Sequence, residues 1–333
     1  MKAMVLRQFA AIETSPLRLE SIEVPDPEEG EVLMKVEACG VCHTDLHTVE
    51  GDLPAANLPI VPGHQVVGKV AKLGFGASSL QHGDKVGVAW LHSTCGHCSF
   101  CLSGKENLCP QARFTGYHVN GGYAEYIIAP EKFVYPLPEK SASVHLAPLL
   151  CAGIIGFRSL RLSGIKPGER LALFGFGASA HVTIQVARYW GCEIYVFSRS
   201  ETHRQMAYEM GASWTGTAAQ TPPHPAQAAI IFAPAGELVT RALEIVDRGG
   251  IVTLAGISMT PVPSLNYEKH LYYERSLRSV ANSTREDGHE FLKLAMEIPI
   301  KTTVEVYSLE DANQVLQRLK KGQINGAAVL SLD

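Results

Sequence analysis

From residue 153 to residue 282 the chain alternates between strand patterns and helix patterns. In chain order the predicted elements are strand 170–174, helix 179–189, strand 193–197, helix 201–210, strand 228–232, helix 236–246 and strand 251–255. Alternation of this kind is typical of a parallel, doubly wound sheet. We therefore predict an α/β domain of the Rossmann type over residues 153–282.

The first half of the chain has a different character. Short alternating or β-branched runs at residues 31–37, 66–72, 85–88 and 123–128 are separated by Pro and Gly, which indicates an all-β, partly open barrel. After residue 282 the pattern predicts a helix at 288–296, a strand near 303–307 and a helix at 309–320. We predict that residues 1–152 form this β-rich domain and that residues 283–333 complete it.

A glycine-rich turn follows the first predicted strand of the α/β domain. Gly175, Gly177 and Ala180 match the pattern G-x-G-x-x-A, with Ala178 and Ser179 between them. The first glycine allows a tight turn, the second lets the backbone approach a pyrophosphate, and the small third residue lets helix and strand pack closely. Because the turn joins a strand to a helix in a βαβ unit, it predicts a dinucleotide site. The alternative is a glycine-rich turn of an unrelated α/β domain.

The end of the second strand of this domain indicates which dinucleotide is bound. An acidic residue there would bind the 2′-hydroxyl of NAD, but the chain has Ser198, Arg199 and Ser200. Arg199 can pair with a 2′-phosphate, and His203 follows closely. We therefore expect NADP(H) to be preferred over NAD(H). The alternative is that Arg199 is an ordinary solvated residue.

Cysteine spacing predicts two zinc sites. Cys95, Cys98, Cys101 and Cys109 follow the pattern C-x2-C-x2-C-x7-C, which suits a closed, structural zinc site of four thiolates. Cys42, His64 and Cys151 form a second, sparser set with three ligands. Three protein ligands leave the fourth position of a zinc ion open, as in catalytic sites. The two remaining cysteines, Cys39 and Cys192, are interpreted as small buried hydrophobes, although Cys39 is a rival ligand to Cys42.

Composition excludes several classes of protein. The length of 333 residues suggests two domains, and a hydrophobic content of 46% is incompatible with wholesale disorder. The net charge of −4 provides no basic surface for nucleic acid. The N-terminal sequence shows no signal peptide or anchor, and no apolar run is long enough to span a membrane. We expect a cytoplasmic protein whose eight cysteines serve mainly as metal ligands.

These motifs together resemble the zinc-dependent alcohol dehydrogenases of the medium-chain dehydrogenase/reductase superfamily. The markers are GVCHTDLH at 40–47, PGHQVVG at 62–68, the four-cysteine lobe and CAGI at 151–154. The resemblance runs over nearly the whole chain and implies a GroES-like catalytic domain beside the Rossmann domain. Ser198, Arg199 and Ser200 resemble the NADP-using members, such as cinnamyl alcohol dehydrogenases.

The resemblance implies roles for residues around the open site. Cys42, His64 and Cys151 would bind the catalytic zinc, and Asp45 would orient His64. Thr44 falls where the family places a hydroxyl that touches the substrate oxygen. The alternative for Thr44 is a plain turn residue.

Two histidines beside Thr44 also match family positions. His47 falls where the family's proton relay reaches solvent through the nicotinamide ribose, and His43 would lie near the cofactor pyrophosphate. The alternative for His47 is a surface histidine.

Two positions depart from the family pattern. Gln65 stands where many members have Glu, so the negative charge beside the metal is lost. Ala327 stands where several members carry an arginine to the pyrophosphate. Trp90, just before the cysteine lobe, is a candidate wall of an apolar substrate pocket, the alternative being a core aromatic residue.

The resulting functional prediction is hydride transfer between NADP(H) or NAD(H) and a primary alcohol or aldehyde. The alternative is an NADPH-dependent alkene or quinone reductase on the same scaffold, but such enzymes lack the set Cys42, His64 and Cys151. A zinc-ribbon nucleic-acid binder is disfavoured by the charge of −4, and a catalytically retired protein by the intact ligand set. We expect a homodimer or homotetramer in which residues 267–280 pair across subunits.

Overall fold

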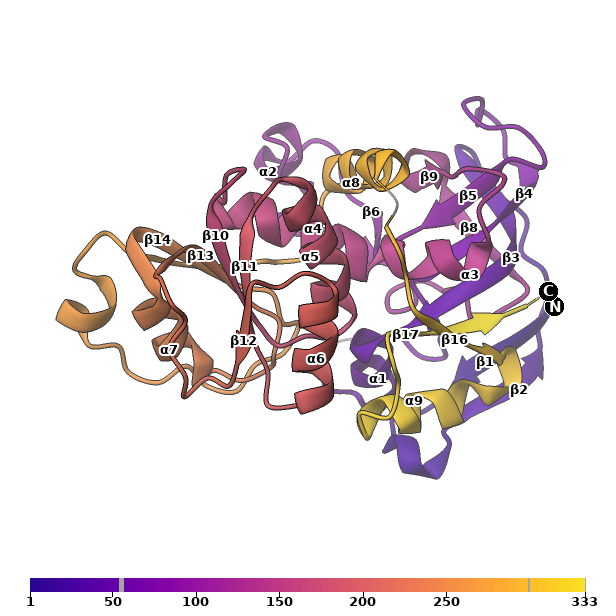
Figure 1. The fold of residues 1–333 in the computed structure, drawn as a ribbon. Coiled ribbons are helices and arrows are strands. Elements are labelled where there is room, and N and C mark those ends of the chain that lie inside the picture. The colour runs from indigo at the N-terminus through magenta and orange to yellow at the C-terminus, as the bar shows by residue number, and fades with distance from the viewer. Residues whose placement is uncertain (54–56, 299, 333) are drawn as a thin grey trace. The chain divides into compact units, whose positions relative to one another are not determined.

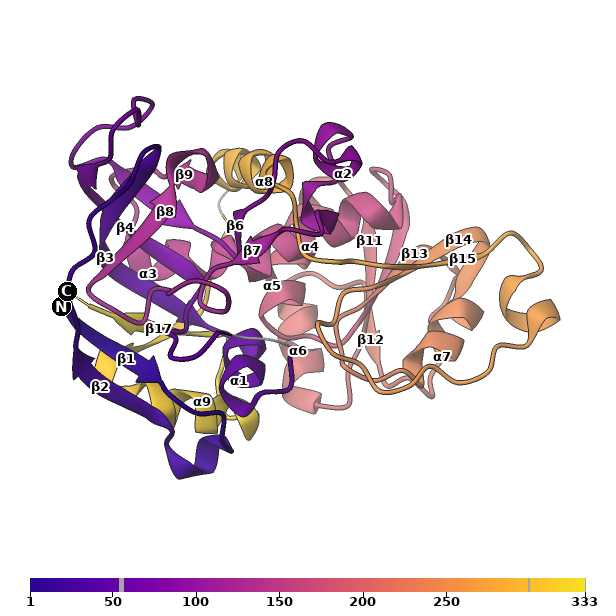
Figure 2. The ribbon, with the colours of Figure 1, turned by 180° about the vertical axis from the view of Figure 1, so that it is seen from behind.

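The computed structural model describes residues 1–53, 57–298 and 300–332. The chain forms two compact units (Figures 1 and 2). Unit 1 comprises Met1–Cys151, Thr284–His289 and Lys301–Asp333, and unit 2 comprises Ala152–Ser283 and Glu290–Ile300. Each unit has its own β-sheet.

The main sheet of unit 1 is organised around its longest strand, β3 (Glu31–Val41). On one side it continues through β4 (Gln65–Leu73), β5 (Lys85–Val88) and β9 (Val134–Pro136), all antiparallel to their neighbours. The other edge of β3 is shared: the first half pairs with β8 (Tyr126–Pro130) and the second half with β17 (Ala327–Ser331), which runs parallel to β16 (Val304–Ser308). Strand β3 therefore ends between two neighbours, and the next residue is Cys42.

Shorter elements of unit 1 surround this sheet. They are the antiparallel pairs β1 (Lys2–Leu6) with β2 (Leu17–Ser21) and β6 (Leu91–Ser93) with β7 (Arg113–Phe114), and the helices α1 (His43–Glu50), α2 (Ser99–Leu102), α3 (Ser143–Leu146) and α9 (Ala312–Lys320). Helix α1 begins directly after Cys42 and ends at Gly51, whose φ of 78° stops the helix.

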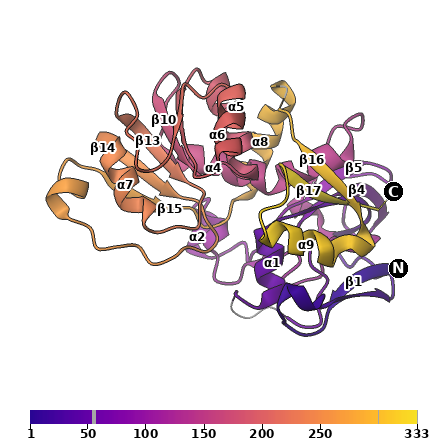
Figure 3. The same ribbon diagram turned by 60° about the horizontal axis from the view of Figure 1, so that its bottom comes forward.

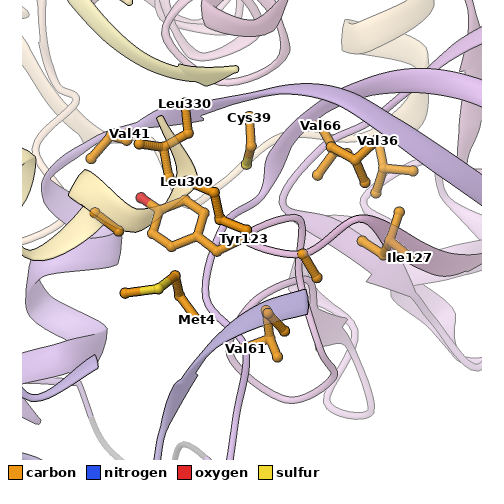
Figure 4. Close-up of a cluster of buried hydrophobic side chains, with 14 of the residues drawn as sticks. Met4, Val36, Cys39, Val41, Val61, Val66, Tyr123, Ile127, Leu309 and Leu330 are labelled. Carbon is orange, nitrogen blue, oxygen red and sulfur yellow. The ribbon is translucent and has the colours of Figure 1, made fainter. Parts of the chain in front are cut away.

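The core of unit 1 joins both ends of the chain to the sheet. Met4 comes from β1, Val36 and Cys39 from β3, and Leu330 from β17, all almost completely buried (Figure 4). Tyr123 lies in the middle of this cluster with no exposed surface. Burial of this apolar surface is the main stabilising contribution to the unit.

Unit 2 contains a six-stranded sheet in which all pairs are parallel. The strand order is β12 (Trp214–Gly216), β11 (Glu193–Phe197), β10 (Arg170–Phe174), β13 (Ala226–Ile231), β14 (Val246–Leu254) and β15 (Ser276–Ser279). Numbered within the unit this is the order 3-2-1-4-5-6 of a Rossmann domain, which confirms the predicted fold class.

Helices cover both faces of this parallel sheet. Helix α7 (Leu238–Ile245) packs on the face that carries the stacked rings of Phe174 and Phe197, whose centroids are 4.3 Å apart. Helices α4 (Ala152–Ser163), α5 (Ala178–Tyr189) and α6 (Glu201–Glu209) lie on the other side of the sheet (Figure 3). The carboxyl end of β10 leads straight into the turn before α5, where the ligand site of such sheets is expected.

The compact units differ from the predicted domain bounds by one residue each at Ala152 and Ser283, which lie in unit 2, and by one longer segment. Residues 290–300 belong to unit 2, although the whole of 283–333 was expected to complete the β-rich domain. The reason lies in helix α8 (Arg285–Glu297), whose Phe291 is fully buried. Its ring centroid is 5.9 Å from that of Phe157, and a Cβ added to Gly153 would lie 2.3 Å from its Cε1.

One helical stretch, Ser143–Ser163, is long and apolar enough to cross a membrane, and 72% of its apolar window is buried inside the structure. Core helices of globular proteins meet the same criteria, so this stretch is weak support for a membrane span.

Candidate metal and cofactor sites

Two groups of metal-ligating side chains lie in unit 1. The Sγ atoms of Cys95, Cys98, Cys101 and Cys109 are all within 4.8 Å of one another. The ligand atoms of Cys42, His64 and Cys151 meet the same limit. The two ligand sets expected from the spacing are therefore each brought together, including Cys151, which is 87 residues beyond His64 in the numbering.

The four-cysteine group has the dimensions of a tetrahedral zinc site. A zinc–sulfur distance of about 2.3 Å places the sulfur atoms of a regular tetrahedron about 3.8 Å apart. The Sγ–Sγ distances are 3.5 Å for Cys98 and Cys101, 3.6 Å for Cys95 and Cys109, and 4.0 Å for Cys95 and Cys101. These residues therefore fit a closed zinc site.

Backbone amides stabilise negative charge on these sulfur atoms. The Cys98 N–H donates to Cys95 Sγ at 3.4 Å, and the N–H groups of Cys95 and Gln111 donate to Cys109 Sγ at 3.5 and 3.4 Å. Backbone donors around His97 and Cys98 lower the pKa of Cys95 to about 6. A thiolate is the form that binds zinc, so these donors favour metal binding at Cys95. At Cys98, by contrast, a backbone hydrogen bond lowers the pKa, but burial and the neighbouring sulfur atoms raise the pKa to about 11 overall.

A partly buried ion pair ties the cysteine lobe to α8. Arg285 donates from its backbone N and from Nε to Glu106 Oε1, at 2.8 and 2.9 Å, and from a terminal nitrogen to Oε2 at 2.6 Å. Its guanidinium also lies 4.5 Å from the ring centroid of Phe133. The two charged residues are 179 positions apart, so no local pattern could have paired them.

The three-residue group also fits zinc, with one position left for another ligand. Cys42 Sγ lies 3.5 Å from His64 Nε2. Zinc bonds of about 2.3 Å to sulfur and 2.0–2.1 Å to nitrogen at a tetrahedral angle would separate these atoms by about 3.5–3.6 Å. His64 is almost completely buried, so its position is set by the protein interior rather than by solvent.

Asp45 orients two of the candidate ligands, Cys42 and His64. Its Oδ1 lies 3.1 Å from His64 Nδ1, and its Oδ2 accepts the backbone N–H of Cys42 at 2.9 Å. The second bond is part of the capping box that starts α1. Because Nδ1 is engaged by a carboxylate, Nε2 is the nitrogen that faces Cys42, which suits a metal-binding tautomer.

Electrostatics around this group favour a cation. Burial lowers the pKa of His64, but the neighbouring Asp45 and Cys42 raise it to about 10 overall. The facing thiol of Cys151, together with burial, raises the pKa of Cys42 well above its usual range. The Cys42 thiol resists ionisation here, and a divalent cation would offset the charge of its thiolate, so proton release and metal binding are linked.

The residues expected to handle protons lie on α1. Thr44 is buried, and its carbonyl accepts a hydrogen bond from Thr48 Oγ1 at 2.8 Å. His47 is half-buried, and its Nδ1 lies 2.8 Å from Oδ2 of Asp52, a partner that the sequence had not indicated. His43 is exposed at the start of the helix.

An aromatic cluster borders the three-residue group. The ring of Trp90 meets that of His64 edge-on, with centroids 4.9 Å apart and an interplanar angle of 76°. Phe114 stacks on Trp90 at 5.1 Å, and Tyr117 lies 5.7 Å from it. Trp90 was expected here, but Phe114 and Tyr117 were not.

The two departures from the family pattern have clear positions. Gln65 is 3% exposed, and within the described part of the chain its Nε2 has no hydrogen-bond partner. Ala327 is the first residue of β17, and its backbone N–H donates to Thr303 O at 2.9 Å. An alanine side chain offers nothing to a phosphate, so any such contact must come from elsewhere.

The glycine-rich turn of unit 2 has the geometry of a phosphate-binding loop. Gly175 has a φ of 89°, and a Cβ there would lie 3.0 Å from the backbone N of Ala233. A Cβ on Gly177 would meet no atom within 4 Å, so the space in front of this residue is open. Helix α5 starts at Ala178, which places its N-terminal amides at this opening.

The rest of the turn packs inward. Ala180 has no exposed surface, and Ser179 O accepts a hydrogen bond from Thr183 Oγ1 at 2.7 Å. His181, which no sequence pattern indicates, lies with its ring centroid 4.6 Å from that of Phe176. Burial and the nearby His203 lower the pKa of His181 to about 4.

The segment expected to choose between NAD and NADP follows β11. Ser200 caps α6 and accepts a hydrogen bond from His203 N at 3.3 Å, while Arg199 is exposed. Arg204 donates from one terminal nitrogen to the carbonyl oxygens of Ser198 and Arg199, at 2.8 and 2.9 Å. The guanidinium of Arg204 therefore fixes the loop, which leaves that of Arg199 available to solvent or a ligand.

Comparison with known proteins agrees with this geometry. The family model of the alcohol dehydrogenase GroES-like domain matches residues 28–139, and that of the zinc-binding dehydrogenases matches residues 178–297. A protein described as "Probable alcohol dehydrogenase AdhA" from Mycobacterium tuberculosis (strain CDC 1551 / Oshkosh) is 48% identical over 99% of this chain and 97% of its own length. An alcohol dehydrogenase of Geobacillus stearothermophilus is 38% identical over the full length of both chains, with 100% of each covered.

Solved structures give the same result. A cinnamyl alcohol dehydrogenase from Sorghum bicolor superimposes with a TM-score of 0.90 at 26% identity, covering 99% of this chain and 97% of that one. A thermostable alcohol dehydrogenase from Pyrobaculum aerophilum, solved with cobalt and zinc, gives 0.90 at 25% identity, with 99% of both chains covered. The chain therefore belongs to the zinc-dependent alcohol dehydrogenases of the medium-chain dehydrogenase/reductase superfamily.

Proposed function

We propose that this chain transfers hydride between NADP(H) and primary alcohols or aldehydes, with NAD(H) as the weaker alternative. One zinc per chain would be held for catalysis by Cys42, His64 and Cys151, and a second for structure by the four-cysteine lobe. The observation that carries the proposal is the 3.5 Å separation of Cys42 Sγ and His64 Nε2, in a group of three ligands that leaves one position open.

A zinc ion held by Cys42, His64 and Cys151 would supply a Lewis acid for an aldehyde carbonyl or an alcohol hydroxyl. Asp45 keeps His64 in the tautomer that binds metal through Nε2. The Thr44 hydroxyl would accept the proton of the alcohol while it releases its own proton to the nicotinamide ribose, from which His47 takes up a proton. His47 passes it to water through Nε2, since Asp52 engages its Nδ1 at 2.8 Å.

NADP(H) preference rests on the segment after β11. Ser198, Arg199 and Ser200 contain no carboxylate that would repel a 2′-phosphate. The exposed guanidinium of Arg199 can pair with such a phosphate, and His203 stands one turn into α6. The opening in front of Gly177 would receive the pyrophosphate.

The aromatic cluster favours apolar substrates. Trp90 brings a flat hydrophobic surface within ring contact of His64, and Phe114 and Tyr117 support it. Such a wall suits primary alcohols and aldehydes with apolar or aromatic groups better than polyols. An alkene or quinone reductase on this scaffold would have no use for the set Cys42, His64 and Cys151.

We also propose a cytoplasmic homodimer or homotetramer that binds neither nucleic acid nor membranes. The net charge of −4 gives no reason to expect nucleic acid as a partner. Strand β15 is the last in the order of the unit 2 sheet, so it offers an edge to a second subunit.

A panel of aldehydes and alcohols, assayed with NADPH, NADH, NADP and NAD, tests the proposed function. The expected result is zinc-dependent turnover of primary substrates with a higher kcat/KM for the NADP(H) pair. Turnover of alkenes or quinones that survives replacement of Cys42 and Cys151 by serine would contradict the zinc mechanism.

A further inference from the structure

The hydroxyl of Tyr123 is a buried polar group to which the proposed mechanism gives no role. The side chain has no exposed surface, and its hydroxyl has no partner within ordinary hydrogen-bond geometry among residues 1–53, 57–298 and 300–332, although a hydrogen bond with Asp45 contributes to its electrostatics. Its backbone is well held, because Tyr123 N donates to Pro62 O at 3.0 Å and Tyr123 O accepts from Met4 N at 2.8 Å. A buried hydroxyl carries a desolvation cost unless it donates to an acceptor, so the nearest acceptor is the group to identify.

The ring lies against the segment that carries His64. Gly63 immediately precedes His64 and has a φ of 99°. A Cβ on Gly63 would lie 2.4 Å from Cδ1 of Tyr123 and 2.8 Å from the Sγ of Cys39. The absence of a side chain at Gly63 therefore lets the tyrosine ring approach the backbone of a candidate zinc ligand.

The hydroxyl end points toward the other ligand segment. In Figure 4 the Tyr123 oxygen is directed to the side of the cluster where Val41 lies, and Val41 is the residue before Cys42. The side chain thus spans the space between the end of β3 and the chain leading to His64. Asp45 occupies the same region, because it bonds to both Cys42 N and His64 Nδ1.

Asp45 can accept another hydrogen bond. Each of its oxygens has one partner, at 2.9 and 3.1 Å, and a carboxylate oxygen has two lone pairs. Burial, followed by the charge of Asp45, raises the pKa of Tyr123 well above its usual range. The phenol therefore stays protonated beside this carboxylate and can act as a donor to it.

We propose that Tyr123 is a positioning residue whose hydroxyl donates to Asp45 and thereby fixes the carboxylate that orients His64 toward zinc. This inference rests on the proposed zinc site of Cys42, His64 and Cys151. The ring supports the backbone at Gly63, while the hydroxyl acts only through Asp45.

The test is Tyr123→Phe, which removes one oxygen and keeps the ring that packs on Gly63. Zinc affinity of the open site is measured by competition with a chromophoric chelator, and the visible spectrum is recorded after cobalt replaces zinc at that site. Partners of metal ligands typically contribute tenfold to a hundredfold in affinity, and Tyr123 stands one bond further out, so a loss of about tenfold or less is expected. Affinity of the four-cysteine site should not change.

Two further variants separate positioning from packing. In an Asp45→Asn background the additional effect of Tyr123→Phe on zinc affinity should nearly vanish, because the Tyr123 hydroxyl acts only through the Asp45 carboxylate. Tyr195→Phe is the matched control: this tyrosine is also fully buried, but its hydroxyl donates to Glu193 in unit 2 at 2.8 Å, so open-site affinity and the cobalt spectrum should stay as in the wild type.

Unchanged affinity and spectrum in Tyr123→Phe would overturn the inference and leave Tyr123 as a core aromatic residue. Additive effects with Asp45→Asn would overturn it as well. If the open site of the wild type binds neither zinc nor cobalt, the proposed function itself fails. This outcome differs from failure of the Tyr123 inference, because it appears before any substitution is made.

Discussion

His47 is held in a way that suits a proton carrier. Gly51 ends α1 in a left-handed conformation, which turns the chain back so that Asp52 N donates to His47 O at 3.0 Å. The Asp52 carboxylate then reaches His47 Nδ1. One ring nitrogen is occupied and the other remains available for exchange.

His47→Gln should lower alcohol oxidation by roughly tenfold to a thousandfold near neutral pH, the range of a lost general acid–base step. Zinc content and dinucleotide affinity should stay nearly unchanged, because Gln keeps the size of the side chain. The deficit should shrink at high pH, where the alcohol loses its proton with less help. A pH–rate profile identical to that of the wild type would mean that protons leave by another route.

Cofactor choice should depend on the first residue after β11. Ser198→Asp brings a carboxylate to the place where a 2′-phosphate is expected, so NADPH binding should weaken by about 1–3 kcal/mol, the scale of a charge-assisted hydrogen bond. NADH binding should improve or stay constant. Fluorescence titration with NADPH and NADH measures the ratio of the two dissociation constants, with Arg204→Lys as a control for loop integrity. A wild-type preference for NADH would refute the assignment at once.

Single residues could be predicted from sequence where their role depends on spacing. The four cysteines within 15 positions, and the motifs around Cys42 and His64, indicated which side chains would meet. Asp52 and Phe114 could not be found in this way. Asp52 depends on the turn at Gly51, and Phe114 reaches Trp90 only through the pairing of β6 with β7.

Among the secondary-structure elements, the loop between β10 and α5 offers a matched pair of glycines. Gly177→Ala should lower the free energy of unfolding by only about 1 kcal/mol, because its Cβ points into open space but alanine is a poorer N-cap than glycine. It should weaken dinucleotide binding by about tenfold or more, since the pyrophosphate needs that space. Gly175→Ala should instead destabilise the protein by about 1–3 kcal/mol, because φ is 89° and Ala233 is close.

Chemical denaturation and cofactor titration of both variants measure these effects. Normal dinucleotide binding by Gly177→Ala would show that the pyrophosphate does not lie at this turn.

The cysteine lobe and α8 are joined by the pair of Glu106 and Arg285. Burial raises the pKa of Glu106, but the hydrogen bonds and charge of Arg285 outweigh it, and the pKa is lowered from its ordinary value of 4.5. Stability from a depressed carboxyl pKa is present above the unfolded value and is lost as the pH falls through the folded value. The pair should therefore contribute fully at pH 7 and progressively less below about pH 4.5.

Glu106→Gln should lower the free energy of unfolding at pH 7 by about 1–3 kcal/mol. This is below the usual cost of breaking a buried pair, because Arg285 is partly exposed. The difference in free energy of unfolding between Glu106→Gln and the wild type should become smaller as the pH falls. Denaturant unfolding from pH 7 to pH 3 measures it, and a difference independent of pH would show that charge is not the cause. Glu290→Gln, which alters an exposed ion pair with Arg161, is the control.

Elements with a strong local pattern could be predicted closely. The strands at 85–88, 170–174 and 193–197 have the bounds expected from sequence. Strands β12 and β17 and the hairpin of β1 and β2 were missed, because they are short or depend on distant partners. Ala328 pairs with Val41, for example, and no local pattern shows that a strand so near the C-terminus joins β3.

For the molecule as a whole, composition and the change of pattern near residue 152 were sufficient to predict two units with different architectures. The unit to which α8 belongs could not be predicted, because its two ends belong to different units. Arg285 bonds to Glu106 within unit 1, and Phe291 packs on Phe157 within unit 2. A sequence pattern shows that a helix is amphipathic but not which core its buried residues join.

The central claim is that two zinc ions per chain have different roles, one closed and structural, the other open and catalytic. Native mass spectrometry during slow chelation, with activity followed in parallel, tests it most directly. We predict two zinc ions in the active enzyme and loss of the first together with activity while the protein stays folded, because a site with an open position exchanges more easily. Full activity with one zinc ion or none, or unfolding that accompanies loss of the first ion, would contradict the account.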